Sequence, residues 1–213
     1  ELHMDRYHDK IARKYGLVTQ NLKNIPKPLN GKLHQALKWS EMGVNLVPGG
    51  LGWMREVLGS TGFLATLLRP DLSFTQGHLQ RFITCCTEEV RAATKHYLQY
   101  IVNTPRARLL YRQLGDSERF EISGSADSDW KGCMFTGKST GGHVIALNNQ
   151  LIHWTSKILP GKTKMSATEA EFQQAGLACK DLLFFRNCHN FCVEQGGDPK
   201  FALAESMELE LEQ

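Results

Sequence analysis

The sequence of 213 residues lacks any apolar run near the roughly 20 residues that a membrane-spanning helix needs. No secretory signal peptide is visible at its start. The net charge is only +3, so charge alone does not indicate a nucleic-acid-binding protein, and any basic surface must be local. We therefore expect a protein of the nucleus or cytoplasm that is not secreted and has no membrane partner.

The six cysteines do not form the two matched pairs that a structural zinc site usually has. Cys188 and Cys192 stand one helical turn apart and are expected to pack within a helix, and all the thiols are expected to be reduced. Apolar residues make up 41% of the chain and charged residues 22%, which favours a folded protein. The length suffices for one or two domains with a buried core.

The first half of the chain is predicted to be mainly helical. Apolar residues recur at helical spacing in residues 5–15, 53–68, 74–83 and 87–102. Pro26 and Pro28 enforce an extended segment after the first of these helices. Residues 32–52 have an irregular pattern that predicts no regular element. We therefore predict a helical bundle for this half.

The second half predicts strands followed by one long helix. Phe120, Ile122 and Gly124 alternate with polar residues in the segment 119–127, as is typical of a strand. The segments 143–148 and 151–158 flank Asn148, Asn149 and Gln150, which predicts a β-hairpin. Residues 165–192 have apolar residues at helical spacing, and either Ser166 or Thr168 is a suitable N-cap. The expected fold class is α+β.

Acidic residues stand at the end of the predicted strand and at the start of the predicted helix. Asp127 and Asp129 are two residues apart, so an extended chain projects both to one face. The helix has an apolar stripe of Ala175, Ala178, Leu182 and Phe185. One turn before Ala175 stands Glu171, and a charge at the head of a core-facing stripe is costly unless something pairs with it. A metal ion shared with Asp127 would explain the placement of Glu171.

Four motifs follow one another in this half of the chain. They are Ser-Ala-Asp-Ser-Asp-Trp at 125–130, Lys-Ser-Thr-Gly-Gly at 138–142, Trp-Thr-Ser-Lys at 154–157 and Ser-Ala-Thr-Glu-Ala-Glu-Phe at 166–172. Their order and separation resemble the ribonuclease H (RNase H) domain of Ty1/copia retrotransposon polyproteins. Upstream residues, such as 5–17, 26–33 and 95–101, resemble the thumb and connection region that leads into that domain in copia-type reverse transcriptases.

The resemblance implies an N-terminal helical thumb/connection-like region (4–104), an RNase H-like mixed β-sheet with a long packed helix (105–195), and an acidic tail or linker (196–213). The polymerase aspartate motif is absent, so we expect no polymerase activity. The family has two further aspartates after the helix, the first in an Asp-Asn-Gln-Ser-Ala strand that this sequence lacks. The sheet is therefore expected to be incomplete at its C-terminal strands, with an open edge that residues 201–211 or another chain could cover.

The resemblance also assigns candidate site residues. Asp127 and Glu171 match the catalytic, metal-binding pair, and Asp129 and Asp198 are candidates to replace the missing acids. RNase H cleavage uses two magnesium ions about 4 Å apart, so Mg²⁺ or Mn²⁺ is the expected cofactor if the chain is active, and none otherwise.

Basic residues are candidates for nucleic-acid contacts, although a solvated helix face commonly carries such charges. These candidates are Arg81, Arg91, Lys95, Lys138 and Lys157. Trp130 and Trp154 are expected to pack in the core rather than to stack on bases, because both flank strands.

Two functions are compatible with these residues, and so is an inert fragment of an element. The first is a retrotransposon-derived, catalytically degenerate RNase H-like module, such as a domesticated host protein, that binds an RNA:DNA hybrid or another protein chain. The protein partner would add a strand at the open sheet edge or form a homodimer. The second is an active Mg-dependent ribonuclease H that cleaves the RNA strand of RNA:DNA hybrids.

Overall fold

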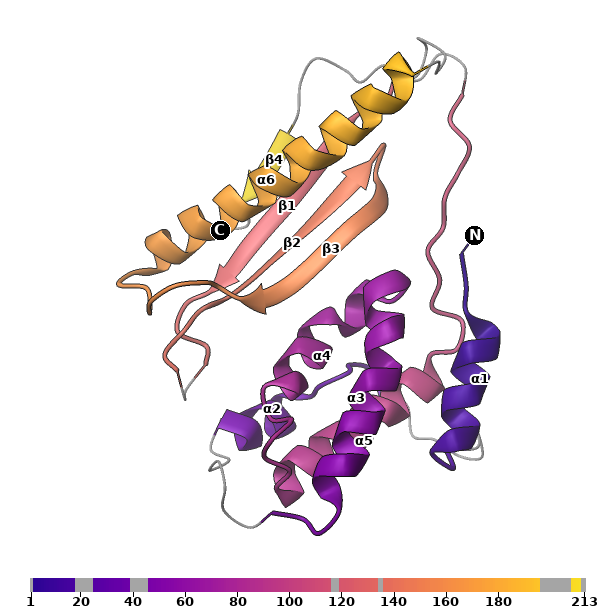
Figure 1. Ribbon diagram of the computed structural model, residues 1–213, viewed down its shortest axis with the longest axis vertical. Helices are drawn as coiled ribbons and strands as arrows, with labels where there is room; N and C mark the ends of the chain where they lie inside the picture. The colour runs from indigo at the N-terminus through magenta and orange to yellow at the C-terminus, as the bar shows by residue number, and fades with distance from the viewer. Residues whose placement is uncertain are drawn as a thin grey trace. The chain divides into compact units, whose positions relative to one another are not determined.

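The computed structural model describes residues 2–17, 25–38, 46–115, 119–133, 136–195 and 208–211. The chain divides into two compact units, Glu1–Leu109 and Leu110–Gln213 (Figure 1). The first unit is helical and the second combines a β-sheet with a helix, so the protein has a mixed α and β fold. None of the helices in the described part of the chain combines the length and the apolar character of a membrane span.

The first unit contains α1 (Asp5–Lys14), α2 (Gly31–Lys38), α3 (Gly50–Leu67), the 3₁₀ turn η1 (Pro70–Leu72), α4 (Ser73–Gln80) and α5 (Glu88–Asn103). The four predicted helices are confirmed as α1, α3, α4 and α5. Helix α2 lies where the sequence predicts no element. It is short, it begins with the Leu33 amide donating to Asn30 Oδ1 at 2.9 Å, and it buries Leu37 completely. Tertiary packing therefore stabilises a helix whose own pattern is weak.

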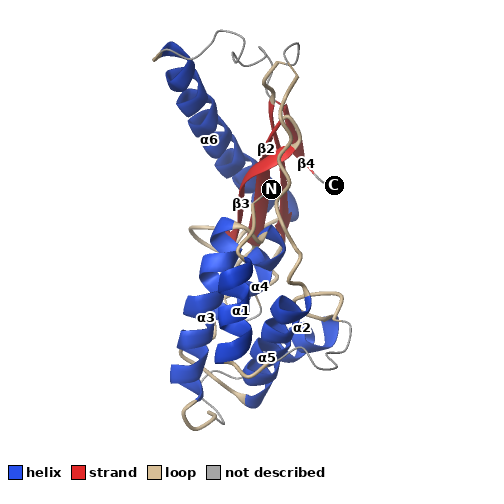
Figure 2. Ribbon diagram, turned by 90° about the vertical axis from the view of Figure 1, so that its right-hand side faces the viewer, coloured by secondary structure: helices blue, strands red, loops and turns tan. Residues whose placement is uncertain are grey.

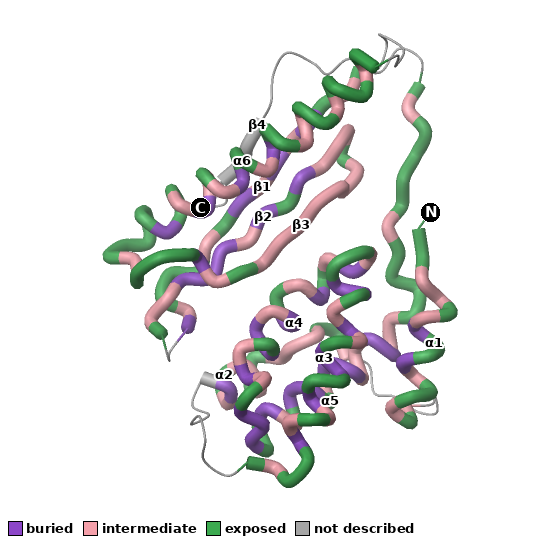
Figure 3. The backbone as a smooth tube through the Cα atoms, viewed as in Figure 1, coloured by how far each residue is buried: buried purple, intermediate pink, exposed green. Residues whose placement is uncertain are grey.

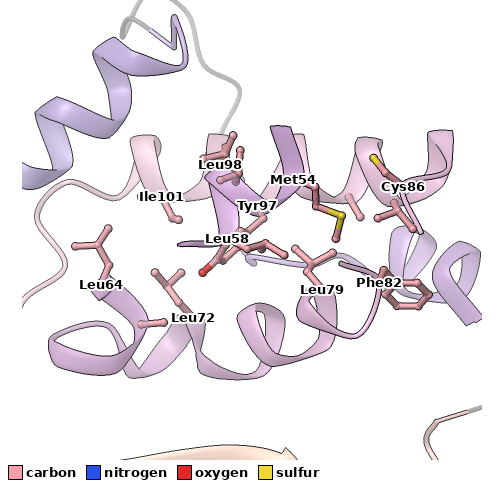
Figure 4. Close-up of a cluster of buried hydrophobic side chains, with 14 of the residues drawn as sticks. Met54, Leu58, Leu64, Leu72, Leu79, Phe82, Cys86, Tyr97, Leu98 and Ile101 are labelled. Carbon is pink, nitrogen blue, oxygen red and sulfur yellow. The ribbon is translucent and has the colours of Figure 1, made fainter. Parts of the chain in front are cut away.

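The core of the first unit lies between α3, α4 and α5. Figure 4 shows Met54 and Leu58 from α3 facing Leu79 from α4 and Tyr97 and Ile101 from α5. Each of these five side chains is at most 1% exposed. Helix α5 starts where Thr87 Oγ1 accepts from the Val90 amide at 3.4 Å, which is the N-cap that fixes where this core helix begins.

A polar network crosses this core. Gln76 Oε1 accepts from the Thr61 hydroxyl at 2.8 Å and from the Tyr97 hydroxyl at 3.0 Å, and Gln76 Nε2 donates to the Leu58 carbonyl at 2.8 Å. All three polar side chains are at most 5% exposed. Burial raises the pKa of Tyr97, so its hydroxyl stays protonated and can donate. The network pairs buried polar groups that would otherwise destabilise the core.

The second unit contains β1 (Ile122–Asp129), β2 (Thr140–Leu147), β3 (Gln150–Ile158), α6 (Ala167–Glu194) and β4 (Glu208–Leu211). The strand order is β3-β2-β1-β4, with antiparallel pairing from β1 to β3 and parallel pairing of β4 with β1. Asn148 and Asn149 have φ of 50° and 60°, as a tight hairpin turn of two residues requires. The predicted hairpin is confirmed.

Helix α6 covers one face of the sheet (Figures 1 and 2) and packs against β1 and β2. Buried residues alternate along β1 (Figure 3), and Ile122 meets Ile145 of β2 and Leu182 of α6 in a small apolar cluster. Phe185 and Leu147 pack against this cluster while half-exposed. The cluster is much smaller than the core of the first unit, and the small residues Ala170 and Ala178 of α6 are buried alongside it.

The start of α6 is fixed by a reciprocal cap. Ser166 Oγ accepts from the Glu169 amide at 3.1 Å, and Glu169 Oε2 accepts from the Met165 amide at 2.7 Å. Of the two predicted N-cap residues, Ser166 is therefore the one used. The Glu169 carboxylate is therefore used at this terminus, whereas Glu171 lies just beyond the first turn of the helix.

Strand β4 occupies one edge of β1 along residues Ser123 to Ala126. The chain's own tail therefore covers this stretch of the edge, which was one of the two expected alternatives. All six cysteines are free, as expected. Cys188 and Cys192 lie exposed on α6 rather than packed, because this part of the helix turns them away from the sheet.

Candidate functional site

The predicted acidic pair stands at one end of the second unit. Strand β1 ends and helix α6 begins at the same end of the sheet (Figure 1). Asp127, Asp129 and Glu171 are all exposed there. Asp127 Oδ1 accepts from the Ser128 amide at 2.7 Å, which orients its carboxylate locally. The end of β1 and the start of α6, which are expected to supply the pair, therefore lie at the same end of the sheet.

The burial pattern of α6 corrects one step of the sequence argument. The buried line along the helix is Ala170, Gln174, Ala178 and Leu182. Ala175 is only half-buried, and Glu171 follows the first buried residue and is exposed. The expected costly burial of Glu171 is therefore wrong, because the sheet contacts the helix one residue earlier than the apolar stripe indicates. Glu171 needs no metal ion to offset desolvation.

The described acids do not assemble into a larger ligand set. A metal site needs three or more His, Cys, Asp or Glu side chains with their ligand atoms close together. Within the described part of the chain, Asp127, Asp129 and Glu171 belong to no such group with all ligand atoms within 4.8 Å of one another. Carboxylates are suitable donors for Mg²⁺, but a two-ion centre requires several of them around the same point. These acids therefore do not fit the two-ion centre. Asp198 lies outside the described residues.

Lysines surround the same end of the sheet. They come from the loop after β1, the end of β3 and the loop before α6, and are Lys131, Lys138, Lys157, Lys162 and Lys164. Exposed Lys157 of β3 pairs with Gly141 of β2. The next residue of β2, Gly142, pairs with Asp127 of β1. Lys164 Nζ lies 3.7 Å from Glu169 Oε1 and is partly neutralised. The strand end therefore combines exposed acids with a wider group of basic side chains.

Trp130 lies next to these lysines and is 44% exposed, so the expectation that it packs in the core is wrong. Its indole Nε1 donates to the Lys164 carbonyl at 3.3 Å, and Lys131 Nζ lies 4.5 Å from the centre of its ring. The hydrogen bond satisfies the indole N–H while the ring lies at the surface. Trp154 is half-buried on β3.

The basic candidates of the first unit have separate surroundings. Arg91 is half-buried, with Nη1 at 3.5 Å from Glu88 Oε1, and Lys95 is exposed one turn later on α5. Arg81 is half-buried at the end of α4. Their assignment to nucleic-acid contacts stays a prediction.

A second polar cluster, which the sequence analysis does not predict, lies under α6. His143 of β2 is buried, with Nε2 at 2.9 Å from Asp181 Oδ2 and Nδ1 at 2.9 Å from Gln174 Nε2. His153 Nε2 of β3 lies 3.5 Å from the same Asp181 oxygen. Burial lowers the pKa of His143, although the hydrogen bond and charge of Asp181 raise it. The imidazole is therefore held neutral at pH 7.

Comparison with known proteins finds similarity to mobile-element sequences. It is 32% identical over 119 residues to the retrovirus-related Pol polyprotein from transposon RE1 of Arabidopsis thaliana, covering 56% of this chain and 8% of that polyprotein. It is 29% identical over 128 residues to the transposon RE2 polyprotein of the same plant, covering 60% and 8%. Homologues of the chain are retrovirus-related Pol polyproteins from copia-type transposons.

A longer match reaches the Pol polyprotein from transposon TNT 1-94 of Nicotiana tabacum, with 25% identity over 187 residues, or 87% of this chain and 14% of that polyprotein. The chain thus spans less than a sixth of the length of these Pol polyproteins. No protein-family model and no solved structure matches it significantly.

Proposed function

We propose that the chain is a retrotransposon-derived RNase H-like module that binds RNA:DNA hybrids and cleaves them feebly or not at all. The Pol homologues support the origin. The fold supports the domain type, because a long helix covers the sheet and a strand that follows this helix, β4, lies beside the strand that holds Asp127. The sequence motifs around Asp127 and Glu171 support it as well.

The observation that carries the proposal is the mixture of charges at the end of β1. Asp127 and Glu171 are present and exposed, yet neither belongs to a larger ligand group within the described residues, while lysines from three segments lie at the same end of the sheet. Two scattered carboxylates bind magnesium weakly, because this hard cation prefers several oxygen ligands in near-octahedral geometry. Lysines instead attract phosphates without requiring a metal ion. The site is therefore better suited to holding a duplex backbone than to cutting it.

Trp130 adds a contact of a second kind. An exposed aromatic ring offers a stacking surface to an unpaired base, and Lys131 above the ring already shows that its π-face attracts cations. Lys138 and Lys157 border the same strand end. The expected complex is dominated by contacts with the nucleic-acid backbone and has little sequence preference, since lysines bind phosphates rather than base edges.

The alternative function is an active Mg-dependent ribonuclease H. It is favoured by the retention of both Asp127 and Glu171 at one end of the unit. A bound Mg²⁺ or Mn²⁺ would activate water for attack on the RNA phosphate. If hybrid binding fails, the remaining proposal is binding to a protein. That partner would add a strand at a sheet edge or would be a second copy of the chain.

Hybrid binding is tested by fluorescence anisotropy with a labelled RNA:DNA duplex at several salt concentrations. We expect Lys138→Ala and Lys157→Ala each to weaken binding about threefold to tenfold and to lower the salt dependence by roughly one charge. Lys180→Ala is the matched control, because Lys180 is exposed on α6 but away from the strand end. Identical affinity of all three variants and the unaltered chain would contradict the proposal.

A further inference from the structure

The cluster under α6 joins three elements through groups that bind metal ions. His143 pairs with Thr155 and His153 pairs with Ile145 across β2 and β3, so the two imidazoles are diagonal neighbours on the same sheet face. Ile145 belongs to the apolar cluster beneath α6, which identifies this face as the one the helix covers. Asp181 of α6 lies against both rings, whose centres are 5.6 Å apart.

The spacing of the ligand atoms matches a small tetrahedral ion. Asp181 Oδ2 lies 2.9 Å from His143 Nε2 and 3.5 Å from His153 Nε2, and each of the three residues has a ligand atom within 4.8 Å of ligand atoms of the other two. Two donors on a tetrahedral Zn²⁺, at about 2.0 to 2.1 Å each, are roughly 3.3 Å apart. The distances therefore require only small side-chain adjustments to admit an ion.

Two further observations point to a ligand rather than to a simple ion pair. His153 Nε2 is buried and has no hydrogen-bond partner, which is unusual for a buried ring nitrogen. Gln174 is 2% exposed and its side-chain amide meets His143 Nδ1. If that amide is turned so that its oxygen accepts from Nδ1–H, the Nε2 lone pair of His143 is free for a metal ion, as is typical of metal-bound histidine.

We propose that His143 Nε2, His153 Nε2 and a carboxylate oxygen of Asp181 bind one divalent transition-metal ion, with Zn²⁺ as the expected occupant. The Asp181 side chain is 44% exposed and that of His153 33%, so an ion can enter from solvent and keep one water ligand. Imidazole nitrogens favour Zn²⁺, Co²⁺ and Ni²⁺ over Mg²⁺. The ion fastens α6 to β2 and β3.

This site is separate from the acids at the strand end. Asp181 follows Glu171 by ten residues, which is a rise of about 15 Å along a helix. The metal site therefore neither depends on the proposed hybrid binding nor supplies ligands to it. Its role is structural, because one ion held by His143, His153 and Asp181 joins α6 to both β2 and β3.

The test uses Co²⁺ titration of the metal-stripped full chain, followed by visible absorption and by thermal unfolding. We expect one tetrahedral Co²⁺ per chain without a thiolate charge-transfer band, and a rise in Tm of several degrees on addition of Zn²⁺. His153→Ala and Asp181→Asn should lose the spectrum and the Tm shift. His189→Ala is the matched control and should keep both.

Folding of the variants is checked first by far-UV circular dichroism without metal. His153→Ala removes ring contacts with His143 and Phe185 but breaks no hydrogen bond of Nε2, so it should retain the helix and strand content of the unaltered chain. The proposal is overturned if the unaltered chain shows no saturable Co²⁺ spectrum. It is equally overturned if the His153→Ala chain retains that spectrum, or if a thiolate band shows that the exposed cysteines of α6 hold the ion.

Discussion

Gly141→Val is expected to lower the free energy of unfolding of the second unit by about 3 kcal/mol. A Cβ atom at this position of β2 would overlap Gln174 Oε1 and would lie 2.7 Å from Leu159 Cδ2. Neither neighbour can withdraw easily, since Gln174 is buried and held by His143, and Leu159 is 2% exposed. The substitution should therefore push α6 away from the sheet, which amide hydrogen exchange of α6 measures directly.

Gly176→Ala is the control for that experiment. Gly176 lies in α6, and nothing lies within 4 Å of its added Cβ, so alanine should stabilise the helix by about 0.5 to 1 kcal/mol. Adding Gln174→Ala to Gly141→Val should recover part of the loss by making room for the valine. Exchange rates in the Gly141→Val chain that equal those of the unaltered chain would show that α6 does not approach β2 this closely.

Gln76→Leu is expected to destabilise the first unit by about 3 kcal/mol, measured by urea unfolding. Leucine fills similar space but removes the acceptor of the Tyr97 hydroxyl and the donor to the Leu58 carbonyl. Tyr97 is fully buried, so its hydroxyl cannot turn to water. The Thr61 hydroxyl keeps a partner, because it also donates to the Val57 carbonyl at 3.0 Å.

The double variant Gln76→Leu/Tyr97→Phe separates two costs in the free energy of unfolding: the loss of hydrogen bonds, and the burial of a Tyr97 hydroxyl that has no partner. Tyr97→Phe alone should cost about 1 kcal/mol, yet in the Gln76→Leu background it should restore about 1 kcal/mol by removing the unpaired group. Strictly additive losses in the double variant would disprove the account of this network.

Local signals in the sequence are sufficient to predict most of the individual helices and strands. Thr87 caps α5, Ser166 caps α6, and Asn148 with Asn149 turns the hairpin, and each of these acts through its own neighbours. The predicted helices and hairpin therefore agree with the structure. Strand β4 was only one of two alternatives, because its pairing with β1 is not local and four residues of alternating Glu and Leu favour no single structure.

The histidine cluster could not be predicted for a specific geometric reason. With a regular two-residue hairpin after Leu147, His153 would pair with Val144 and face away from His143. An irregularity in the pairing between Ile145 and Ala146 shifts the register by one residue, so His153 pairs with Ile145 instead. A shift of one residue exchanges the two faces of a strand. Only the folded register brings His143, His153 and Asp181 together.

The most direct test of the central claim is an RNA-strand cleavage assay on an RNA:DNA hybrid, with Mg²⁺ or Mn²⁺, comparing the unaltered chain with Asp127→Asn. A degenerate module should bind the hybrid and show equally low cleavage in both proteins. Cleavage by the unaltered chain that disappears in Asp127→Asn would contradict this account and establish an active ribonuclease H.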